Sequence, residues 1–231
     1  MLKKNIYQQI EEARIKSRKL IAMLIDPDKF SKENLVQNLK SEKLTKPDFI
    51  FVGGSFLSSD LDTCIDEIKS VCELPIILFP GNACQISNKA DAILLLSLIS
   101  GRNPEFLIGN HVNAAPFLKK SNLEIISTGY ILVGSNNNSS VEYISNTKPI
   151  PADKTDIAIA TALAGEMLGM QLIYLEAGSG AKQSIPNEMV KTISENCKCP
   201  IIVGGGIRTK NEIKEKFDAG ASIVVIGNAW E

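Results

Sequence analysis

Short runs of apolar residues recur at nearly even intervals along the chain, and amphipathic segments separate most of them. A continuous apolar run of this length is typical of a strand buried on both faces, whereas apolar residues three and four apart are typical of a helix with one buried face. The runs predict eight strands, at residues 20–25, 49–52, 76–79, 92–99, 125–133, 171–176, 201–203 and 223–226.

Helical spacing of apolar residues lies between most of these runs. It predicts helices at residues 32–44, 61–68, 104–119, 155–170 and 186–197. A last helix begins with a capping box of Thr209 and Glu212 and ends near Gly220. Residues 1–19 carry a further helical pattern, with Ile6, Ile10 and Ala13 as its apolar positions.

The alternation breaks once, because only residues 82–90 separate the third and fourth strands, which is too short for a crossover helix. Eight alternating units predict a single domain, residues 1–231, folded as an α/β (β/α)8 TIM barrel with a shortened or missing third helix and an extra N-terminal helix. An open doubly wound sheet is the alternative. No eighth helix follows the last strand, so we expect a shortened sequence, or a first strand covered by the N-terminal helix or a partner subunit.

Amino-acid composition excludes only a few classes of function. The 25 basic and 26 acidic residues give a net charge of −1, which argues against a nucleic-acid partner. The five cysteines lack paired zinc spacing, and Cys197 and Cys199 are one residue short of the common thiol pair, so we interpret them as idle thiols in a reducing compartment. Without a signal-peptide core or a membrane-length apolar run, the sequence predicts a cytoplasmic protein.

The candidate chemistry gathers at the ends of the last three strands. Tyr174 and Glu176 point to the same side of the sixth strand, and the glycine loop that follows them offers backbone N–H donors and the Ser179 hydroxyl to an anion. The next two strands run into Gly204–Gly206 and into Gly227 with Asn228. Three such loops in succession predict a phosphate site, as parallel barrels build one at the ends of their last strands.

Asp26 and Ser55 follow the first and second strands, which close the barrel beside the eighth. A lone carboxylate and a hydroxyl suit Mg²⁺, which prefers few protein oxygens together with water and substrate phosphates. The alternatives are a capped turn for Asp26 and a helix-start hydroxyl for Ser55. Their placement at adjacent strand ends favours the metal site.

These motifs together resemble the geranylgeranylglyceryl phosphate synthase family, which includes the bacterial PcrB-type enzymes, and most closely its longer-loop branch. The resemblance spans almost the whole chain and rests on these segments: Leu24-Ile25-Asp26-Pro27-Asp28-Lys29, Val52-Gly53-Gly54-Ser55, Tyr174-Leu175-Glu176-Ala177-Gly178-Ser179-Gly180, Val203-Gly204-Gly205-Gly206-Ile207-Arg208 and Ile226-Gly227-Asn228. It implies Mg²⁺-dependent transfer of a geranylgeranyl (polyprenyl) group from its diphosphate to sn-glycerol 1-phosphate, which forms an ether lipid precursor and releases diphosphate.

The resemblance also implies roles for individual residues. Asp26 and Ser55 correspond to the magnesium positions, Ser55 standing where many members have threonine. The glycerol phosphate positions correspond to Tyr174, Leu175, Glu176, Ala177, Gly178, Ser179, Gly180, Gly205, Gly206, Gly227 and Asn228. The shorter-loop branch has a substrate-binding lysine two positions before the metal aspartate, where this chain has Leu24.

We assign Glu176 as the catalytic base, since it precedes the phosphate loop by a distance that suits a glycerol hydroxyl. The alternative is a carboxylate paired with Arg208 or Lys182. Tyr174 is the second catalytic candidate, although a tyrosine that only fills the barrel fits almost as well. A structural role is favoured for His111, the single histidine.

The missing third helix predicts an apolar groove near strands three and four, with Ala83 and Ile86 setting the accepted chain length. A transient membrane contact and a homo-oligomer complete the expected partners. Three alternatives stay open: a sugar-phosphate isomerase or aldolase, a flavin-binding barrel, and a non-catalytic phosphate-binding or lipid-binding barrel. The isomerases and aldolases usually offer a strand-end lysine that this chain lacks.

Overall fold

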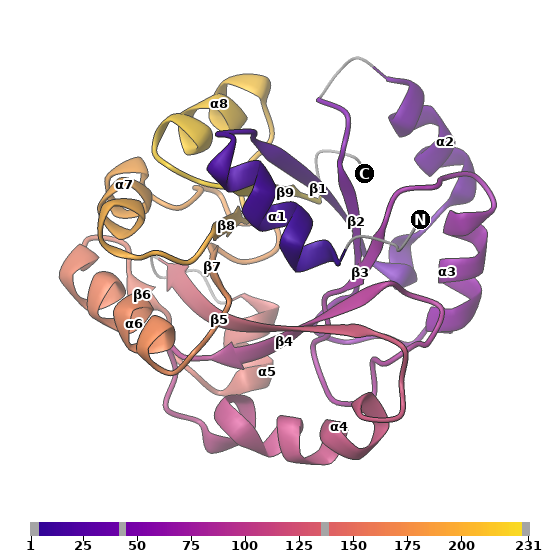
Figure 1. Cartoon of the computed structure of the whole chain (residues 1–231), viewed down its shortest axis with the longest axis horizontal. Helices are drawn as coiled ribbons and strands as arrows, with labels where there is room; N and C mark the ends of the chain where they lie inside the picture. The colour runs from indigo at the N-terminus through magenta and orange to yellow at the C-terminus, as the bar shows by residue number, and fades with distance from the viewer. Residues whose placement is uncertain (1–4, 42–44, 135–138, 228–231) are drawn as a thin grey trace.

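Eight parallel strands close into a barrel in the computed structural model, which describes residues 5–41, 45–134 and 139–227. The barrel strands are β1 (Leu20–Ile25), β2 (Phe49–Val52), β3 (Ile76–Leu78), β4 (Ala92–Leu98), β5 (Glu124–Gly134), β7 (Leu172–Glu176), β8 (Ile201–Gly204) and β9 (Ile223–Ile226). Pairing of β1 with β9 and of β4 with β5 closes the ring, as Figure 1 shows. This confirms the predicted TIM barrel, because an open doubly wound sheet would leave two unpaired edges.

Helices surround the ring at the predicted places. They are α2 (Lys32–Lys40), α3 (Leu61–Lys69), α4 (Asn110–Leu118), α6 (Thr155–Met167), α7 (Asn187–Asn196) and α8 (Lys210–Asp218), whose predicted capping box is present. The predicted helix 32–44 ends at Lys40, and residues 42–44 lie outside the described residues. The helix predicted from residue 104 starts as a π-helical turn, η2 (Glu105–Gly109). The short elements η1 (Pro27–Lys29), α5 (Ser140–Ser145) and β6 (Ile150–Pro151) were not predicted.

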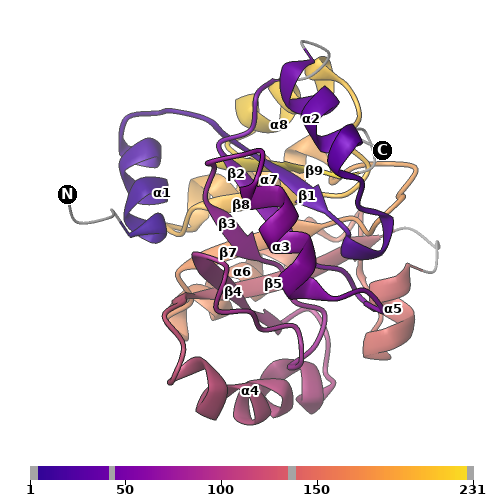
Figure 2. The ribbon, with the colours of Figure 1, turned by 90° about the vertical axis from the view of Figure 1, so that its right-hand side faces the viewer.

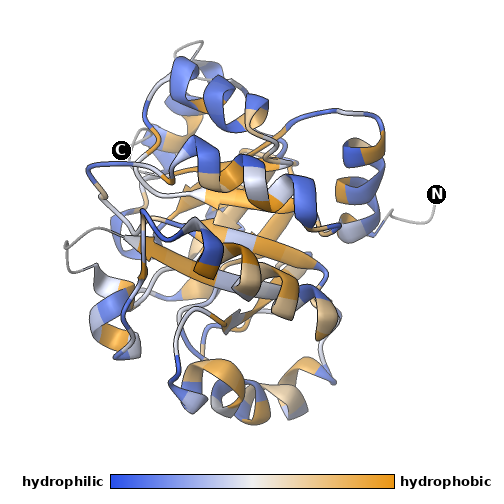
Figure 3. Ribbon diagram, turned by 90° about the vertical axis from the view of Figure 1, so that its left-hand side faces the viewer, coloured by the Kyte–Doolittle hydropathy of each residue, from blue (hydrophilic) through white to orange (hydrophobic). Residues whose placement is uncertain are grey.

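Alternate residues of each strand pack on opposite sides of the sheet and form two core layers. Phe51 and Tyr174 belong to the layer inside the barrel, whereas Val52 and Leu175 belong to the layer under the helices. Because both faces are covered, the strands are mainly apolar, which Figure 3 shows as mostly orange arrows.

The N-terminal helix α1 (Ile6–Ile15) lies across the amino-terminal end of the barrel, in front of the ring of strands in Figure 1. Its buried residues Ile6, Ile10 and Ala13 join the inner core layer. The backbone N–H groups of Ile6 and Tyr7 donate to the Glu124 carboxylate, at 2.5 and 2.8 Å. The helix therefore covers this end of the barrel, and Figure 2 shows it on the side opposite α5.

No helix forms between β3 and β4, where every residue is described and residues 79–91 make only turns. The Gln85 side chain holds this segment in place, since its oxygen accepts from Gly81 N at 2.9 Å and its amide donates to Gly54 O at 2.9 Å. The prediction of a missing third helix is confirmed. Within the described residues, no helix has the combination of length and hydropathy needed to cross a membrane.

Candidate active site

A cleft of about 1230 Å³, counting its open mouth, lies at the carboxyl ends of the strands. Its walls come from seven of the eight barrel strands and the segments that follow them, β4 being the exception, as is usual for the catalytic face of a parallel barrel. Nine of the predicted site residues line it: Asp26, Ser55, Tyr174, Glu176, Ser179, Gly180, Gly205, Gly206 and Gly227.

Three of the predicted residues that the structure describes do not line this cleft. The Leu175 side chain packs in the outer core layer, so only its backbone is available to a ligand. Ala177 lines a neighbouring hollow behind the phosphate loop, and Gly178 uses its N–H within the loop itself. Asn228 lies outside the described residues.

Glu176 ends β7 and is almost completely buried, with 5% of its surface exposed. Burial raises the pKa of its carboxyl to about 7, against the opposing effects of the Gly178 N–H and the Tyr174 hydroxyl. The Gly178 N–H donates to Glu176 Oε1 at 2.7 Å. Arg208 instead donates to Ala181 O at 3.0 Å, so the alternative pairing of Arg208 with Glu176 is not observed between these described residues. A carboxyl with this pKa can accept a proton near neutral pH.

Tyr174 stacks inside the barrel against two aromatic rings. Its ring centroid lies 5.3 Å from that of Phe79, at an interplanar angle of 23°, and 5.3 Å from that of Tyr130. Burial raises the pKa of the Tyr174 hydroxyl well above 10. The hydroxyl lies near enough to Glu176 to lower the pKa of that carboxyl, but it makes no hydrogen bond of good geometry with a described residue. The interpretation as a tyrosine that fills the barrel is therefore correct for the ring, while the hydroxyl remains available to a ligand.

Phe79 and Tyr130 line the cleft and were not predicted as site residues. Tyr130 lies within the long apolar strand β5, where the sequence shows no difference between inward and outward positions. Phe79 is the residue after β3. The sequence signal that could have identified Phe79 as a site residue is its position directly after the apolar residues of a strand.

Position 205 requires glycine because Glu176 and the start of the phosphate loop lie too close for a side chain. Its φ of +82° is left-handed, and a Cβ there would lie 2.4 Å from Glu176 Oε1 and 2.9 Å from Gly178 N. A side chain of any kind would push the carboxylate and the start of the phosphate loop apart. The close packing of Gly205 therefore holds the loop after β8 against the start of the loop after β7.

Asp26 and Ser55 lie at neighbouring strand ends, since Ile25 of β1 pairs with Val52 of β2. Asp26 Oδ1 accepts from Asp28 N at 3.1 Å, so the capped turn is present. This bond leaves further carboxylate lone pairs for a ligand. Ser55 does not begin a helix, because Asp60 caps α3, and the helix-start interpretation of Ser55 is therefore wrong.

Gly54, which directly precedes Ser55, leaves room for a ligand beside Asp26. A Cβ at Gly54 would lie 3.5 Å from Asp26 Oδ1, so the glycine leaves open the space beside this oxygen. Lys29 Nζ lies 3.8 Å from Asp26 Oδ2 on the cleft wall. Two oxygen donors and a cation thus face one part of the cleft.

An apolar groove of about 830 Å³, counting its open mouth, continues from the cleft under the β3–β4 segment. The two form one continuous space, because they share six wall residues: Gly54, Ser55, Phe79, Tyr130, Val141 and Ile144. The rest of the groove is mainly aliphatic and aromatic: Ala83, Ile86, Ile93, Leu94, Leu95, Leu96, Leu98, Phe106, Ala114 and Leu118. A long apolar ligand fits this groove with its polar end in the cleft.

His111 lines the groove at a distance from the phosphate loops. Its Nε2 lies 3.0 Å from Ser97 Oγ, and its buried Nδ1 has no partner among the described residues. Burial lowers the pKa of the ring, which favours the neutral imidazole. The structural role predicted for His111 remains a prediction.

Known proteins resemble this chain along nearly its whole length. The geranylgeranylglyceryl phosphate synthase of Flavobacterium johnsoniae is 53% identical over 227 residues, which are 98% of this chain and 93% of that protein. The enzyme of the same name from Methanosphaera stadtmanae is 40% identical over 228 residues, 98% of this chain and 93% of that one.

Solved structures give the same result. Geranylgeranylglyceryl phosphate synthase from Thermoplasma acidophilum, in complex with its substrate sn-glycerol-1-phosphate, superposes with a TM-score of 0.90 at 31% identity, covering 99% of this chain and 92% of that one. An N-acetylmannosamine-6-phosphate 2-epimerase from Clostridium perfringens reaches a TM-score of 0.57 at 16% identity, over 91% of this chain and 86% of its own, which is a likeness of fold alone. The PcrB family model matches residues 12–231. The chain therefore belongs to the PcrB family.

Proposed function

We propose that this protein transfers a geranylgeranyl group from its diphosphate to the C3 hydroxyl of sn-glycerol 1-phosphate, forming an ether lipid precursor and releasing diphosphate. The observation that carries the proposal is the continuity of a polar cleft with an apolar groove. Such a space takes an anionic head and a long hydrocarbon chain together. Relatives that bear the name geranylgeranylglyceryl phosphate synthase in bacteria and archaea support the same reaction.

The glycerol phosphate binds at the ends of β7, β8 and β9 in this proposal. Backbone N–H groups at Ser179, Gly180, Gly205 and Gly206 surround the phosphate, and the Ser179 hydroxyl adds a donor. Arg208 lies on the same wall and adds positive charge. The glycerol then extends toward Glu176 and the Tyr174 hydroxyl, which has its donor free.

The residues around Asp26 fit a magnesium ion. A carboxylate and a hydroxyl oxygen are hard donors, they come from adjacent strand ends, and Gly54 leaves the space beside Asp26 Oδ1 open. Asp26 and Ser55 would hold the ion. Magnesium bound there supplies charge neutralisation for the diphosphate that leaves. Lys29 contributes a further positive charge at this wall.

Glu176 acts as the base. As the glycerol oxygen forms its bond to the allylic carbon and the bond from that carbon to diphosphate breaks, Glu176 accepts the hydroxyl proton. Its raised pKa, about 7, makes the carboxylate a stronger base than an exposed glutamate. The cluster of Phe79, Tyr130 and Tyr174 rings excludes water beneath the reacting carbon.

The groove walls are expected to set the prenyl chain length. Replacing Ala83 or Ile86 with tryptophan should shorten the preferred prenyl diphosphate, because both residues line the groove and a larger ring fills the space that the chain needs. Competition between diphosphates of different length measures the preference. We expect the ratio to change by about 10-fold or more. An unchanged ratio in both variants would place the chain elsewhere.

Substituting Gly205 tests the geometry of the phosphate loop. Gly205→Ala should lower kcat/KM by about 100-fold, since a Cβ 2.4 Å from Glu176 Oε1 displaces the base. Gly169→Ala is the matched control, because Gly169 is also left-handed, at +84°, and a Cβ there meets nothing within 4 Å. Both variants carry the same kind of backbone strain. An equal loss of activity in the two variants would show that backbone strain, and not the contact with Glu176, causes the loss.

The deciding experiment for the reaction is a turnover assay with magnesium, each glycerol phosphate enantiomer and prenyl diphosphates of several lengths. Diphosphate release and the extracted lipid product are followed together. We expect product from sn-glycerol 1-phosphate only, with geranylgeranyl diphosphate as donor. Binding of glycerol phosphate without product would instead favour a non-catalytic barrel. The homo-oligomer and the transient membrane contact stay predictions, which light scattering and vesicle sedimentation can test.

A further inference from the structure

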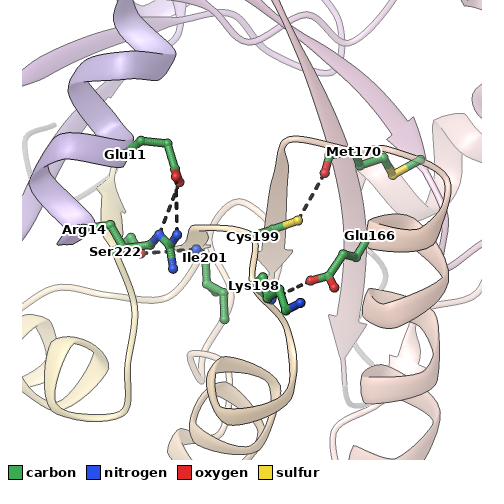
Figure 4. A network of polar contacts seen from close by, with 8 residues as sticks. All are labelled: Glu11, Arg14, Glu166, Met170, Lys198, Cys199, Ile201 and Ser222. Carbon is green, nitrogen blue, oxygen red and sulfur yellow. Dashed lines mark hydrogen bonds and ion pairs between the residues drawn. The ribbon is translucent and has the colours of Figure 1, made fainter.

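Two thiols and a carboxylate meet at the amino-terminal end of the barrel, away from the cleft. Cys197 follows α7, Cys199 precedes β8, and Glu166 lies on the last turn of α6. Figure 4 shows Cys199 and Glu166 on neighbouring segments, with Lys198 between them. The proposed reaction uses none of these groups, because the substrates bind at the opposite ends of the strands.

The three side chains have the spacing of a metal centre. Their sulfur and oxygen atoms all lie within 4.8 Å of one another. Cys197 Sγ lies 3.1 Å from Glu166 Oε2. In a tetrahedral zinc site, bonds of about 2.3 Å to sulfur and about 2.0 Å to oxygen place neighbouring ligand atoms about 3.5–3.8 Å apart. Small side-chain rotations are enough to reach that geometry.

The donor atoms already converge on one carboxylate oxygen. The Cys197 thiol donates to Glu166 Oε2 at 3.1 Å, and the Lys198 N–H donates to the same oxygen at 2.5 Å. Cys197 is buried, with 8% exposed, and this keeps competing water away from its sulfur.

Two oppositely charged residues of α1 lie near the cluster. Arg14 Nε lies 3.2 Å from Glu11 Oε1, so the two side chains pair with each other and add no net charge there. Figure 4 shows this pair on α1, facing the cluster. Cys199 Sγ lies 3.1 Å from Met170 O, to which the thiol now donates. Loss of that proton frees the carbonyl oxygen as a candidate fourth ligand.

We propose that Glu166, Cys197 and Cys199 bind a divalent transition metal ion, with zinc as the best match to two thiolates and a carboxylate. Thiolate ligands select zinc over magnesium, so this site and the oxygen site at Asp26 hold different ions. Binding releases the thiol protons and joins α6 to the α7–β8 connection. The bound ion is a structural staple that stabilises the folded barrel.

Cobalt absorption tests the ligand type directly. The full-length protein is stripped with a chelator, reduced, saturated with magnesium and titrated with Co²⁺. Cobalt bound to thiolates produces an intense near-ultraviolet band that oxygen ligands do not produce. We expect the band to saturate at one ion per chain and to disappear when zinc displaces cobalt. Absence of the band in the wild-type protein overturns the proposal, whatever the variants do.

Zinc affinity, measured by competition with a chromogenic chelator, then tests the residues. We expect a wild-type Kd below about 1 µM. Cys199→Ser and Cys197→Ser should each weaken binding more than about 100-fold, since loss of a ligand costs more than loss of a supporting contact. Cys72→Ser is the matched control, because Cys72 is a partly buried free thiol outside the cluster, and its affinity should equal that of the wild type. Equal affinity in all variants overturns the assignment.

Thermal unfolding gives a readout of the staple. Zinc at about 100 times its Kd should raise the wild-type Tm by roughly 5–10 °C and leave Cys199→Ser unchanged. Turnover in magnesium should be the same with and without zinc, because the cluster and the cleft lie at opposite ends of the barrel. A zinc-dependent kcat together with an unchanged Tm would assign the metal to the cleft and would overturn the proposal that zinc stabilises the fold at this cluster.

Discussion

Glu176→Gln is expected to lower kcat by about 10²–10⁴-fold, the usual contribution of a positioned general base. Glutamine keeps the size of the side chain and its hydrogen bond from the Gly178 N–H. It cannot accept the proton of the glycerol hydroxyl. Binding of glycerol phosphate, measured by calorimetry, should change little, because the phosphate is held by the loops and not by this carboxylate.

The pH dependence of the wild-type enzyme tests the same role. Only the carboxylate form accepts a proton, so kcat/KM should fall about tenfold for each pH unit below the pKa of about 7. In Glu176→Gln the residual activity should lose this limb of the profile. A glutamine variant that keeps both its rate and its acid limb would remove Glu176 from the chemistry.

Stability separates lost chemistry from lost folding. Burial raises the pKa of Glu176 from 4.5 to about 7, so the folded state binds the proton more tightly than the unfolded state. The resulting stabilisation is fully present below pH 4.5 and is lost as the pH rises through 7. At pH 8 the wild-type protein holds a buried charge that Glu176→Gln lacks. The variant should therefore have the higher Tm at pH 8, while it has the lower activity.

Asp26→Asn is expected to reduce turnover by at least about 10³-fold, since a divalent ion supplies several kcal/mol of charge stabilisation. Asparagine can still accept the hydrogen bond from Asp28 N, so the turn after β1 should persist. The loss comes from the missing negative charge. The magnesium concentration that gives half-maximal rate should rise strongly in this variant, which distinguishes a metal ligand from a residue that only shapes the loop.

Asp66→Asn is the matched control. Asp66 is an exposed aspartate paired with a lysine, Lys89, as Asp26 is paired with Lys29, but it lies on α3 outside the cleft. Its replacement removes the same charge and should leave the rate and the magnesium dependence unchanged. Full activity of Asp26→Asn, or an equal loss in both variants, would refute the metal role.

The sequence alone determined the strands, because each buried parallel strand is a mainly apolar run that needs no distant partner to be recognised. All eight predicted strands are present, with shifts of one or two residues, such as the end of β3 at Leu78. It also determined the helix that is missing, since residues 82–90 are too few to cross the sheet. The places of Asp26, Ser55 and Glu176 at strand ends that line the cleft were predictable, because a strand end shows in the sequence as a change from apolar to polar residues.

Only the tertiary structure decided how these parts meet. The pKa of about 7 for Glu176 comes from burial, and that burial depends on Gly205 coming against it from the next strand. The ring contact between Tyr174 and Tyr130 forms because these two residues, from β7 and β5, are partners in the strand register. Glu166 and Cys197 lie 31 residues apart and meet because α6 and α7 pack together. Closing the barrel creates these contacts, and a local pattern of apolar residues contains no information about which distant side chain will lie beside it.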